Sequence, residues 1–319
     1  MSSVATDGGS PTTASPPPRT RMDLTHKVRP GEAVIKGLLR LAAAASVLTT
    51  VGIVVSLIRP AVDFFRAVPV TEFLTGTSWS PNLAPQSFGV LPLVGGTLVT
   101  TVIGLLIAVP LGLGTAMYLS EYARPATRRR LKPILELLAG VPSVVYGFFA
   151  LSFITPTVLK SWFGLEVGFT NALAAGVVLG IMIIPTVASL SEDAMSAVPH
   201  ALRQGSFAMG ANRMQTTLRV VFPAAISGIA AAVVLGLSRA VGETMIVALA
   251  AGSQPNLSID PREGMQTMTG FMATTAGGEN PVGSVSYNTL FAVGLLLFCI
   301  TLVVNLLSIA LVRRLREEY

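Results

Sequence analysis

Residues 91–119 read LPLVGGTLVTTVIGLLIAVPLGLGTAMYL, a run of 29 residues that contains no charged side chain. A helix needs about 20 mostly apolar residues to cross the roughly 30 Å hydrocarbon core of a bilayer. This stretch is therefore long enough to span a membrane as one helix. The alternating ten-residue segments that are typical of outer-membrane barrels do not occur in the chain. We therefore expect an all-α integral membrane protein.

The composition of the whole chain supports a membrane location. Of its 319 residues, 51% are hydrophobic and only 12% are charged, about half of the roughly 25% found in soluble domains. So few charges cannot cover an aqueous surface, which excludes a soluble enzyme, a nucleic-acid-binding domain and a disordered scaffold. The single cysteine, Cys299, excludes a disulfide framework, and two distant histidines, His26 and His200, form no metal-binding cluster.

Six stretches are long and apolar enough to be transmembrane helices. They lie at about 36–58, 91–119, 134–158, 170–190, 223–250 and 287–312. Several contain proline, and such interruptions survive in lipid only where neighbouring helices or a water-lined cavity satisfy the freed backbone groups. We therefore expect a six-span domain over residues 35–312 that encloses a pathway, with a disordered tail at 1–34 and a short tail at 313–319.

The distribution of lysine and arginine predicts the orientation of these spans. With the N-terminus in the cytoplasm, 17 of the 22 basic residues lie inside, four lie outside and Arg239 lies within a span. Basic residues concentrate on the cytoplasmic side of membrane proteins, where they meet anionic lipid headgroups. The count predicts a multi-pass protein of the cell membrane with both termini in the cytoplasm, and it explains the net positive charge without nucleic acid.

The chain has no ATP-binding motif of its own. A phosphate-binding P-loop requires Gly-Lys followed by Ser or Thr, and none of the four lysines follows a glycine. No other catalytic motif is present, so we expect a non-enzymatic subunit without cofactors. Three energy sources remain open at this point: ATP hydrolysis by a partner chain, an ion gradient, or none in a passive channel.

The most informative polar segment is the predicted cytoplasmic loop 191–222. Ser191, followed by Glu192 and Asp193, is typical of a helix start. Pro199 suits the first turn of a second short helix, Gly210 terminates it, and a third helical stretch begins near Arg213. The mixture of small and apolar residues around 201–209 fits a helix that inserts into a groove of another protein or one that lies on the membrane surface.

The spacing within this loop matches a known motif. Gln204-Gly205-Ser206, three residues, Gly210, nine residues, Val220, one residue and Phe222-Pro223 resemble the coupling-helix motif of ATP-binding-cassette (ABC) importer permeases. The family pattern is Glu-Ala-Ala, x3, Gly, x9, Ile, x, Leu-Pro. The resemblance implies a type I ABC-importer permease fold whose cytoplasmic coupling helices contact an ATPase through Gln204, Gly205, Ser206, Gly210 and Pro223.

Further segments are similar to one branch of that family. AGVPSVVYG at 139–147, the run from Thr97 to Ala123, and LSRAVGETM at 237–245 resemble phosphate-specific (Pst) importer permeases. The Glu-Thr-Met ending and FGVLPL at 88–93 are more similar to their C-type subunit. The resemblance implies an A-type permease partner, two ATPase subunits that bind ATP and Mg, and an extracytoplasmic phosphate-binding protein. The alternatives are a permease for molybdate or sulfate and, less favoured, an ion-coupled secondary anion carrier.

Arg239 and Glu243 are the only charged residues in the predicted fifth span. Their spacing of four puts them on one face of a continuous helix, and charges at such depth face protein or water. They form either a structural pair or a station for an anion, which the guanidinium binds with two hydrogen bonds. The Pst resemblance favours the second reading. Tyr146 and Ser143, which flank Pro142, are further candidates for the substrate pathway.

Glu243 beside an anion pathway has two explanations. Phosphate near neutral pH carries a proton that it can donate to this carboxylate, whereas sulfate cannot, so Glu243 would select phosphate. Alternatively, Glu243 only orients Arg239. Elsewhere, Gly176 and Gly180 form a GxxxG motif that predicts a helix-packing face, and Glu121, near the cytoplasmic interface, is expected to be exposed to solvent.

Overall fold

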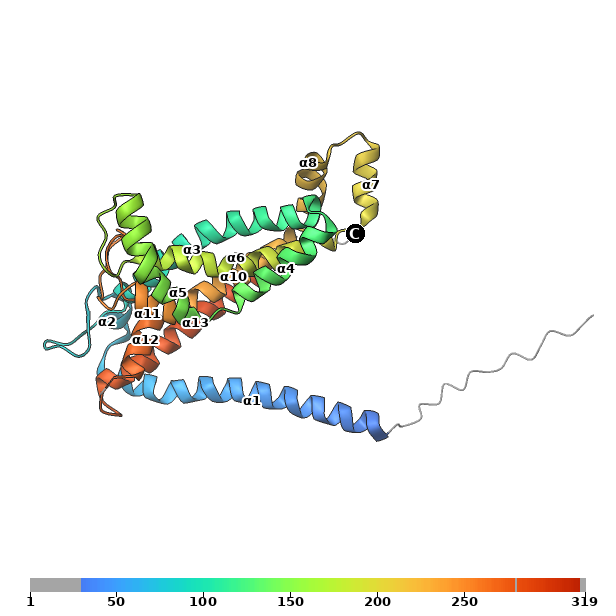
Figure 1. Cartoon of the computed structure of the whole chain (residues 1–319). Helices are drawn as coiled ribbons and strands as arrows, with labels where there is room; N and C mark the ends of the chain where they lie inside the picture. Colours follow the sequence, from blue (N-terminus) through green and yellow to red (C-terminus); the bar gives the residue numbers. More distant parts are fainter. Residues whose placement is uncertain (1–29, 279, 316–319) are drawn as a thin grey trace, which may run out of the picture. The chain divides into compact units, whose positions relative to one another are not determined.

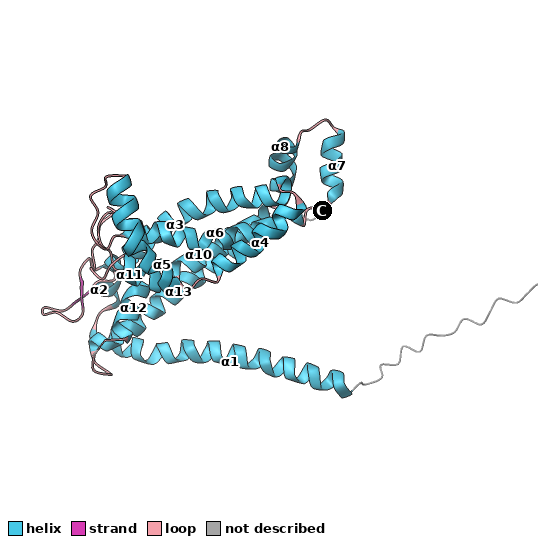
Figure 2. Cartoon of the chain, in the orientation of Figure 1, coloured by secondary structure: helices cyan, strands magenta, loops and turns pink. Residues whose placement is uncertain are grey.

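The computed structural model describes residues 30–278 and 280–315. Most of the predicted N-terminal tail and the end of the C-terminal tail lie outside these ranges. Helices dominate the described part, and its strands form one short hairpin (Figure 2). The first half contains α1 (Pro30–Ala67), α2 (Val70–Thr75), β1 (Trp79–Ser80), β2 (Ser87–Phe88), α3 (Leu91–Met117), the π-helical turn η1 (Tyr118–Tyr122), α4 (Pro125–Ala139), α5 (Ser143–Phe149) and the π-helical segment η2 (Ala150–Trp162).

The second half begins with a long helix and continues through several short ones. Its elements are α6 (Ala172–Ser196), α7 (His200–Ala208), α8 (Arg213–Thr216), the π-helical turn η3 (Thr217–Val221), α9 (Phe222–Ala224), α10 (Ile226–Val241), α11 (Met245–Ala250), α12 (Met268–Ala276) and α13 (Val285–Leu315). The chain divides into two compact units, Met1–Gly52 and Ile53–Tyr319. The described residues of the first unit form the beginning of α1, and the second unit contains all the other described elements.

Five helical stretches of the described part are long and apolar enough to cross a membrane: 34–67, 91–122, 143–162, 172–196 and 285–314. A sixth span exists if the pair 213–224 and 226–241, bent by 72°, counts as one. The predicted third span, 134–158, is interrupted because the helix breaks at 140–142, so the apolar helix starts at Ser143. The predicted fifth span, 223–250, is also divided, into α9, α10 and α11.

Helix α6 is the centre of the bundle and packs closely against α3 and α10. An added Cβ at Gly176 would come within 2.7 Å of Ile103 on α3, and one at Gly180 within 2.8 Å of the Gly104 carbonyl oxygen. On the α10 side, a Cβ at Gly236 would lie 3.0 Å from Val187. In lipid, where burial of apolar surface drives association weakly, small residues allow the backbone approach that stabilises helix pairs. The predicted GxxxG packing face is confirmed.

The short elements gather at two opposite ends of this bundle. Helices α7 and α8 lie at one end, and α2, α11 and α12 lie at the other (Figure 1). The second end is held by an aromatic cluster in which Phe64 meets Phe73 and Phe88 edge-on, and Trp79 meets Phe271 with ring centroids 4.9 Å apart. We call the two ends of the bundle the α7–α8 end and the α2–α12 end.

Because α3 and α6 approach closely at some glycines and not at others, an added methyl group should destabilise the protein at Gly180 but not at Gly114. Gly180→Ala should lower the yield of folded protein and its melting temperature in detergent, because the new Cβ meets backbone and overpacking costs about 1–3 kcal/mol. Gly114→Ala on α3 is the matched control, since nothing lies within 4 Å of its added Cβ in the described residues. Equal melting temperatures for the two variants would contradict the proposed packing.

Candidate functional site

The break between α4 and α5 leaves backbone carbonyl groups that other elements satisfy. Helix α4 ends at Ala139, and Pro142 precedes the first residue of α5. The Tyr146 hydroxyl on α5 donates to the Leu138 carbonyl oxygen at 3.0 Å. The Arg239 guanidinium on α10 donates to the Ala139 carbonyl oxygen at 3.4 Å. Two of the predicted pathway residues, Arg239 and Tyr146, therefore meet at this break.

Arg239 is half-buried between three helices. Besides the Ala139 carbonyl of α4, its guanidinium contacts the Thr186 hydroxyl of α6 at 3.3 Å. Both distances exceed the usual 2.7–3.2 Å for N–H···O hydrogen bonds, so these contacts are weak. A guanidinium has five N–H donors in a planar fork. Arg239 therefore keeps the capacity to bind an oxyanion with two parallel hydrogen bonds.

Glu243 is not on the same helix face as Arg239, because α10 ends at Val241. The Glu243 carboxylate instead accepts hydrogen bonds from the backbone N–H groups of Met245, at 3.0 Å, and Ile246, at 3.4 Å. These groups start α11, where free N–H groups favour an anion. Within the part of the chain that the structure describes, no ion pair joins Glu243 to Arg239. The prediction of a shared helix face is therefore wrong, while the two explanations of Glu243, selection of phosphate or orientation of Arg239, stay open.

Ser143 is the first residue of α5 and lies at the same break as Tyr146. Its side chain is partly buried. The sequence missed Thr186 and the two carbonyl groups at the end of α4. Carbonyl groups belong to the backbone, so residue identity does not show which of them lack a helical partner. The Gly140-Val141-Pro142 segment was the available signal, because a helix usually ends before a proline and leaves its last carbonyl groups without partners. Substrate contact by Arg239, Glu243, Tyr146 and Ser143 stays a prediction.

The α7–α8 end contains the predicted coupling loop, with a different start. Ser191, Glu192 and Asp193 do not begin a helix, because α6 continues through them to Ser196. Helix α7 then follows Pro199, and the chain turns at Gly210, whose φ of +82° suits glycine. Helix α8 has a capping box in which the Asn212 and Gln215 side chains bond each other's backbone N–H groups.

The coupling-motif residues divide into an outward and an inward set. Gln204 and Gly205 are exposed on α7, and a Cβ at Gly205 would meet nothing within 4 Å in the described residues. Pro223 is exposed in α9. Ser206 faces inward, and its hydroxyl lies 2.9 Å from that of Thr216 on α8. Gln204, Gly205 and Gly210 thus form a small, open surface, while Ser206 holds the two short helices together.

Arg203 anchors α7 to the rest of the bundle. Its guanidinium donates to the Glu121 carboxylate at 2.9 Å and to the Met195 and Val198 carbonyl oxygens at 2.8 and 2.5 Å. The side chains of Arg203 and Glu121 are only 11% and 9% exposed. The prediction that Glu121 is solvated is therefore wrong: 82 residues separate it from Arg203, and only the tertiary fold joins them.

A second ion-pair cluster joins α4 to the end of α6. The Glu192 side chain is 1% exposed and is held by Arg128 and by the Lys132 ammonium at 2.9 Å. Lys132 also contacts Asp193 at 2.5 Å, and Ser196 donates to the Glu192 carboxylate at 2.9 Å. The hydrogen bond to Asp193, followed by that to Glu192, raises the pKa of Lys132 against the opposing effect of burial. Removing the partners of a buried carboxylate costs about 3–5 kcal/mol.

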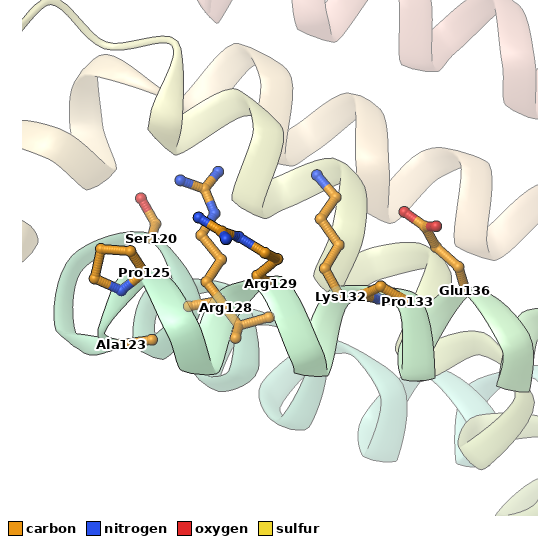
Figure 3. Close-up of a pocket in the computed structure, with 9 residues that line it drawn as sticks. Ser120, Ala123, Pro125, Arg128, Arg129, Lys132, Pro133 and Glu136 are labelled. Atoms are coloured by element: carbon orange, nitrogen blue, oxygen red, sulfur yellow. The ribbon is translucent and has the colours of Figure 1, made fainter.

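The same side chains border the cavity shown in Figure 3. It has a volume of about 560 Å³, and Arg128, Arg129, Lys132 and Glu136 project into it from α4. Arg128 and Lys132 are four residues apart and extend from one face of the helix (Figure 3). These two residues entered the sequence-based prediction only through the count of basic residues, because residue spacing does not show which distant carboxylate lies near them.

The α2–α12 end has its own ion pair in the loop before α12. Arg262 binds Asp260 at 2.6 Å, and its side-chain hydrogen bonds lower the pKa of that carboxyl to about 2. The pair in turn raises the pKa of Arg262. Because a lowered carboxyl pKa gives stability that disappears only as the pH falls through it, this loop stays ion-paired from neutral to mildly acidic pH.

The comparison with known families decides what kind of protein this is. The sequence profile for the inner membrane component of binding-protein-dependent transport systems matches residues 108–317, which contain both α7 and Arg239. The chain belongs to this family. As a member, it is a multi-pass permease subunit of the inner membrane rather than an enzyme, and the predicted family resemblance is confirmed.

Curated relatives in this family cover most of the chain. The probable ABC transporter permease protein YqgH of Bacillus subtilis is 37% identical, over 90% of each chain. The phosphate transport system permease protein PstC of Mesorhizobium japonicum is 33% identical, over 73% of this chain and 75% of the relative. PstC 1 of Mycobacterium tuberculosis is 35% identical, over 76% and 82% respectively.

Solved structures confirm the fold. A chain of a bacterial alginate ABC transporter, in complex with an alginate pentasaccharide-bound periplasmic protein, superposes with a TM-score of 0.64 at 16% identity, covering 89% of this chain and 95% of that one. A chain of the inward-facing MetNI methionine ABC transporter gives 0.52 at 22% identity, covering 72% and 95%. The predicted all-α permease fold of ABC importers is therefore confirmed.

The anchor of α7 predicts a local loss of order when it is removed. Arg203→Gln or Glu121→Gln should speed hydrogen exchange in residues 200–208 of the purified complex, because hydrogen bonds between charged groups contribute about 1.5–3 kcal/mol. The double variant should exchange little faster than Arg203→Gln alone, since Arg203→Gln already removes the contact with Glu121, and Glu121→Gln should have the smaller effect because Arg203 keeps its carbonyl partners. Arg262→Gln, at the opposite end, is the control. Unchanged exchange in α7 of both single variants would exclude the anchoring role.

Proposed function

We propose that this chain is the C-type permease subunit of an ATP-driven importer of inorganic phosphate and forms half of the translocation pathway. The observation that carries the proposal is the 33–37% identity to curated permeases, two of them named for phosphate transport, over 73–90% of this chain. Arg239 adds a chemical reason, because its weakly held guanidinium lies half-buried among α4, α6 and α10. Such a fork matches the oxygens of a phosphate.

In this proposal the α7–α8 end is cytoplasmic and both termini lie on that side. The support is the positive-inside count of 17 basic residues against four. Two ATPase subunits bind ATP and Mg, and one of them receives α7 through Gln204, Gly205 and Gly210. The exposure of this small-residue surface supports the assignment, since a groove on a partner needs close approach.

Two further partners complete the proposed importer. An A-type permease completes the pathway, and an extracytoplasmic phosphate-binding protein delivers the anion to the outer loops at 59–90, 159–169 and 251–286. No cofactor is needed in this chain, because the partner ATPase supplies hydrolysis. ATP-driven closure of the ATPase pair then moves the coupling loop and switches the bundle between outward-facing and inward-facing states.

Two alternatives differ in substrate and in energy source. A molybdate or sulfate permease would share the coupling loop, but it should lack the Arg-Ala-Val-Gly-Glu-Thr run at 239–244 that this chain contains. An ion-coupled secondary carrier would need no ATPase, and membership of a binding-protein-dependent family disfavours it. Copurification of an ATPase with the chain distinguishes the carrier from the importer.

Removal of the Arg239 guanidinium should abolish most transport. We expect Arg239→Ala to lower ATP-dependent phosphate uptake about 10- to 100-fold, and Arg239→Lys to fall between it and the parent, because lysine keeps the charge and loses the fork. Arg130→Gln, on the exposed face of α4, is the matched control. Copurification of all subunits checks assembly, and full uptake by an assembled Arg239→Ala complex would refute the role of Arg239.

Glu243 provides a test of selectivity. If its carboxylate accepts the proton of hydrogen phosphate, Glu243→Gln should admit sulfate, or lose phosphate, because the amide no longer repels a fully ionised anion. Uptake of labelled phosphate and labelled sulfate by the same vesicles measures both effects. Phosphate transport that persists with sulfate still excluded would leave Glu243 only its observed contact with the first turn of α11.

A further inference from the structure

Helix α4 is held in place by polar contacts at its two ends. None of its described side chains is fully buried, and Ile134 and Leu137 are 50% and 74% exposed. In its first half, Arg128 and, at its midpoint, Lys132 bind the carboxylates of α6. At its last turn, the Leu138 and Ala139 carbonyl oxygens accept hydrogen bonds from Tyr146 and Arg239. The position of α4 is therefore set by α6 at one end and by the Arg239 site at the other.

The buried carboxylate of Glu192 makes the first of these contacts obligatory. A carboxylate that is 1% exposed cannot be left without its cations, because an unpaired buried charge is strongly unfavourable. Arg128 and Lys132 are 39% and 28% exposed, so they could reach water if they were released. Glu192 therefore needs its cations more than Arg128 and Lys132 need Glu192. If the end of α6 moves, the two cations of α4 have to move with Glu192.

The end of α6 is directly connected to the coupling loop. Glu192 lies one turn before Ser196, the last residue of α6, and only three residues separate Ser196 from α7. Arg203 on α7 also donates to the Met195 carbonyl oxygen in that last turn. A displacement of α7 therefore reaches Glu192 through short covalent and hydrogen-bonded links.

The other end of α4 adjoins a break in the backbone. Arg128 and Ala139 are separated by about 16 Å along the helix, so α4 joins the Glu192 cluster to the contact of Arg239. Beyond Ala139, the Gly140-Val141-Pro142 break separates α4 from α5 and is a candidate hinge, crossed by the hydrogen bond from Tyr146 to the Leu138 carbonyl oxygen. Helix α4 is continuous from Arg128 to Ala139, although it contains Pro133, and a helix between a hinge and an obligatory ion pair acts as a lever.

We propose that Glu192 is a positioning residue that makes α4 follow the coupling loop, so that motion of α7 changes the contact between Ala139 and Arg239. The inference rests on the proposed function above. In this inference α4 has two positions, one for each state of the coupling loop, and it pivots between them at residues 140–142. Glu192 itself touches no substrate and acts through Arg128 and Lys132.

The test uses the complete reconstituted transporter, with Cys299→Ser to remove the native thiol. Spin labels at Leu137→Cys on α4 and Leu307→Cys on α13 report the α4 position, and labels at Phe207→Cys and Leu307→Cys report α7; all three parent side chains are exposed. In the parent, both distances should change between the nucleotide-free and ATP-bound states. Glu192→Gln should reduce the α4 change, since Lys132 then holds the end of α6 through Asp193 alone, keep the α7 change, and lower the phosphate imported per ATP hydrolysed by about 5-fold or more.

Two variants make the test specific. Glu136→Gln removes a carboxylate of α4 that has no ion-pair partner among the described residues, and it should keep both distance changes. Lys132→Gln removes one cation and leaves Arg128 on Glu192, so its effect should lie between those of Glu192→Gln and the parent. It also replaces Glu192→Gln if that complex does not assemble. An α4 change that persists undiminished in Glu192→Gln, or that is reduced equally in Glu136→Gln, would overturn the inference.

The two readouts separate this inference from the proposed function. The distance change in α4 requires ATP and the partner chains but no phosphate. A parent complex whose α4 moves with ATP but that accumulates no phosphate would refute the function and leave the lever intact. A complex that imports phosphate while Glu192→Gln keeps the full α4 change would refute the lever and leave the function intact.

Discussion

Close contact between helix backbones in α6 and its neighbours is the constraint on which the rest of the structure depends. Lipid is as apolar as leucine, so burial of apolar surface contributes little to helix association, and the bundle relies on short-range packing. Gly176 and Gly180 allow α3 to approach, and Gly236 allows α10 to do so from another side. Helix α6 runs as one continuous helix, with Pro185 inside it, from the candidate pathway region to the predicted coupling loop.

Around that centre, the spans that carry the candidate pathway are broken. In a bilayer, every freed backbone group must find a partner inside the protein. At the α4–α5 break, Tyr146 and Arg239 supply donors to the carbonyl groups, and at the α10–α11 break Glu243 accepts from the N–H groups. The polar residues that keep these breaks stable are the ones predicted to contact the anion, so under the proposed function the state of the pathway would depend on the geometry of the helices.

Electrostatics dominate at the α7–α8 end. The buried pairs of Glu192 with α4 and of Glu121 with Arg203 join elements that are far apart in the sequence. Ion pairs of this kind are directional and are costly to break, so they transmit displacement better than a loosely packed apolar surface. They fit a region that must respond to a partner and remain connected to the bundle.

Much of this architecture follows from the sequence alone. Apolar length, the excess of basic residues on one side, and the small residues at Gly176 and Gly180 are local properties, because the bilayer sets the helix length and glycine sets how closely helices approach. The positions of α7 and of the turn at Gly210 were likewise readable, since proline and glycine impose their own backbone preferences.

Only the tertiary structure decided how the charges are paired. Residues four apart, such as Arg239 and Glu243, lie on one face of a helix only if the helix continues through both of them. Because α10 ends at Val241, the two side chains do not share a helix face. Ser191, Glu192 and Asp193 have the composition of a helix start, yet packing of α6 carried the helix past them and buried Glu192. Its partners Arg128 and Lys132 lie 64 and 60 residues away. Ion pairs depend on distances in space, which residue spacing determines within one helix and leaves open between helices.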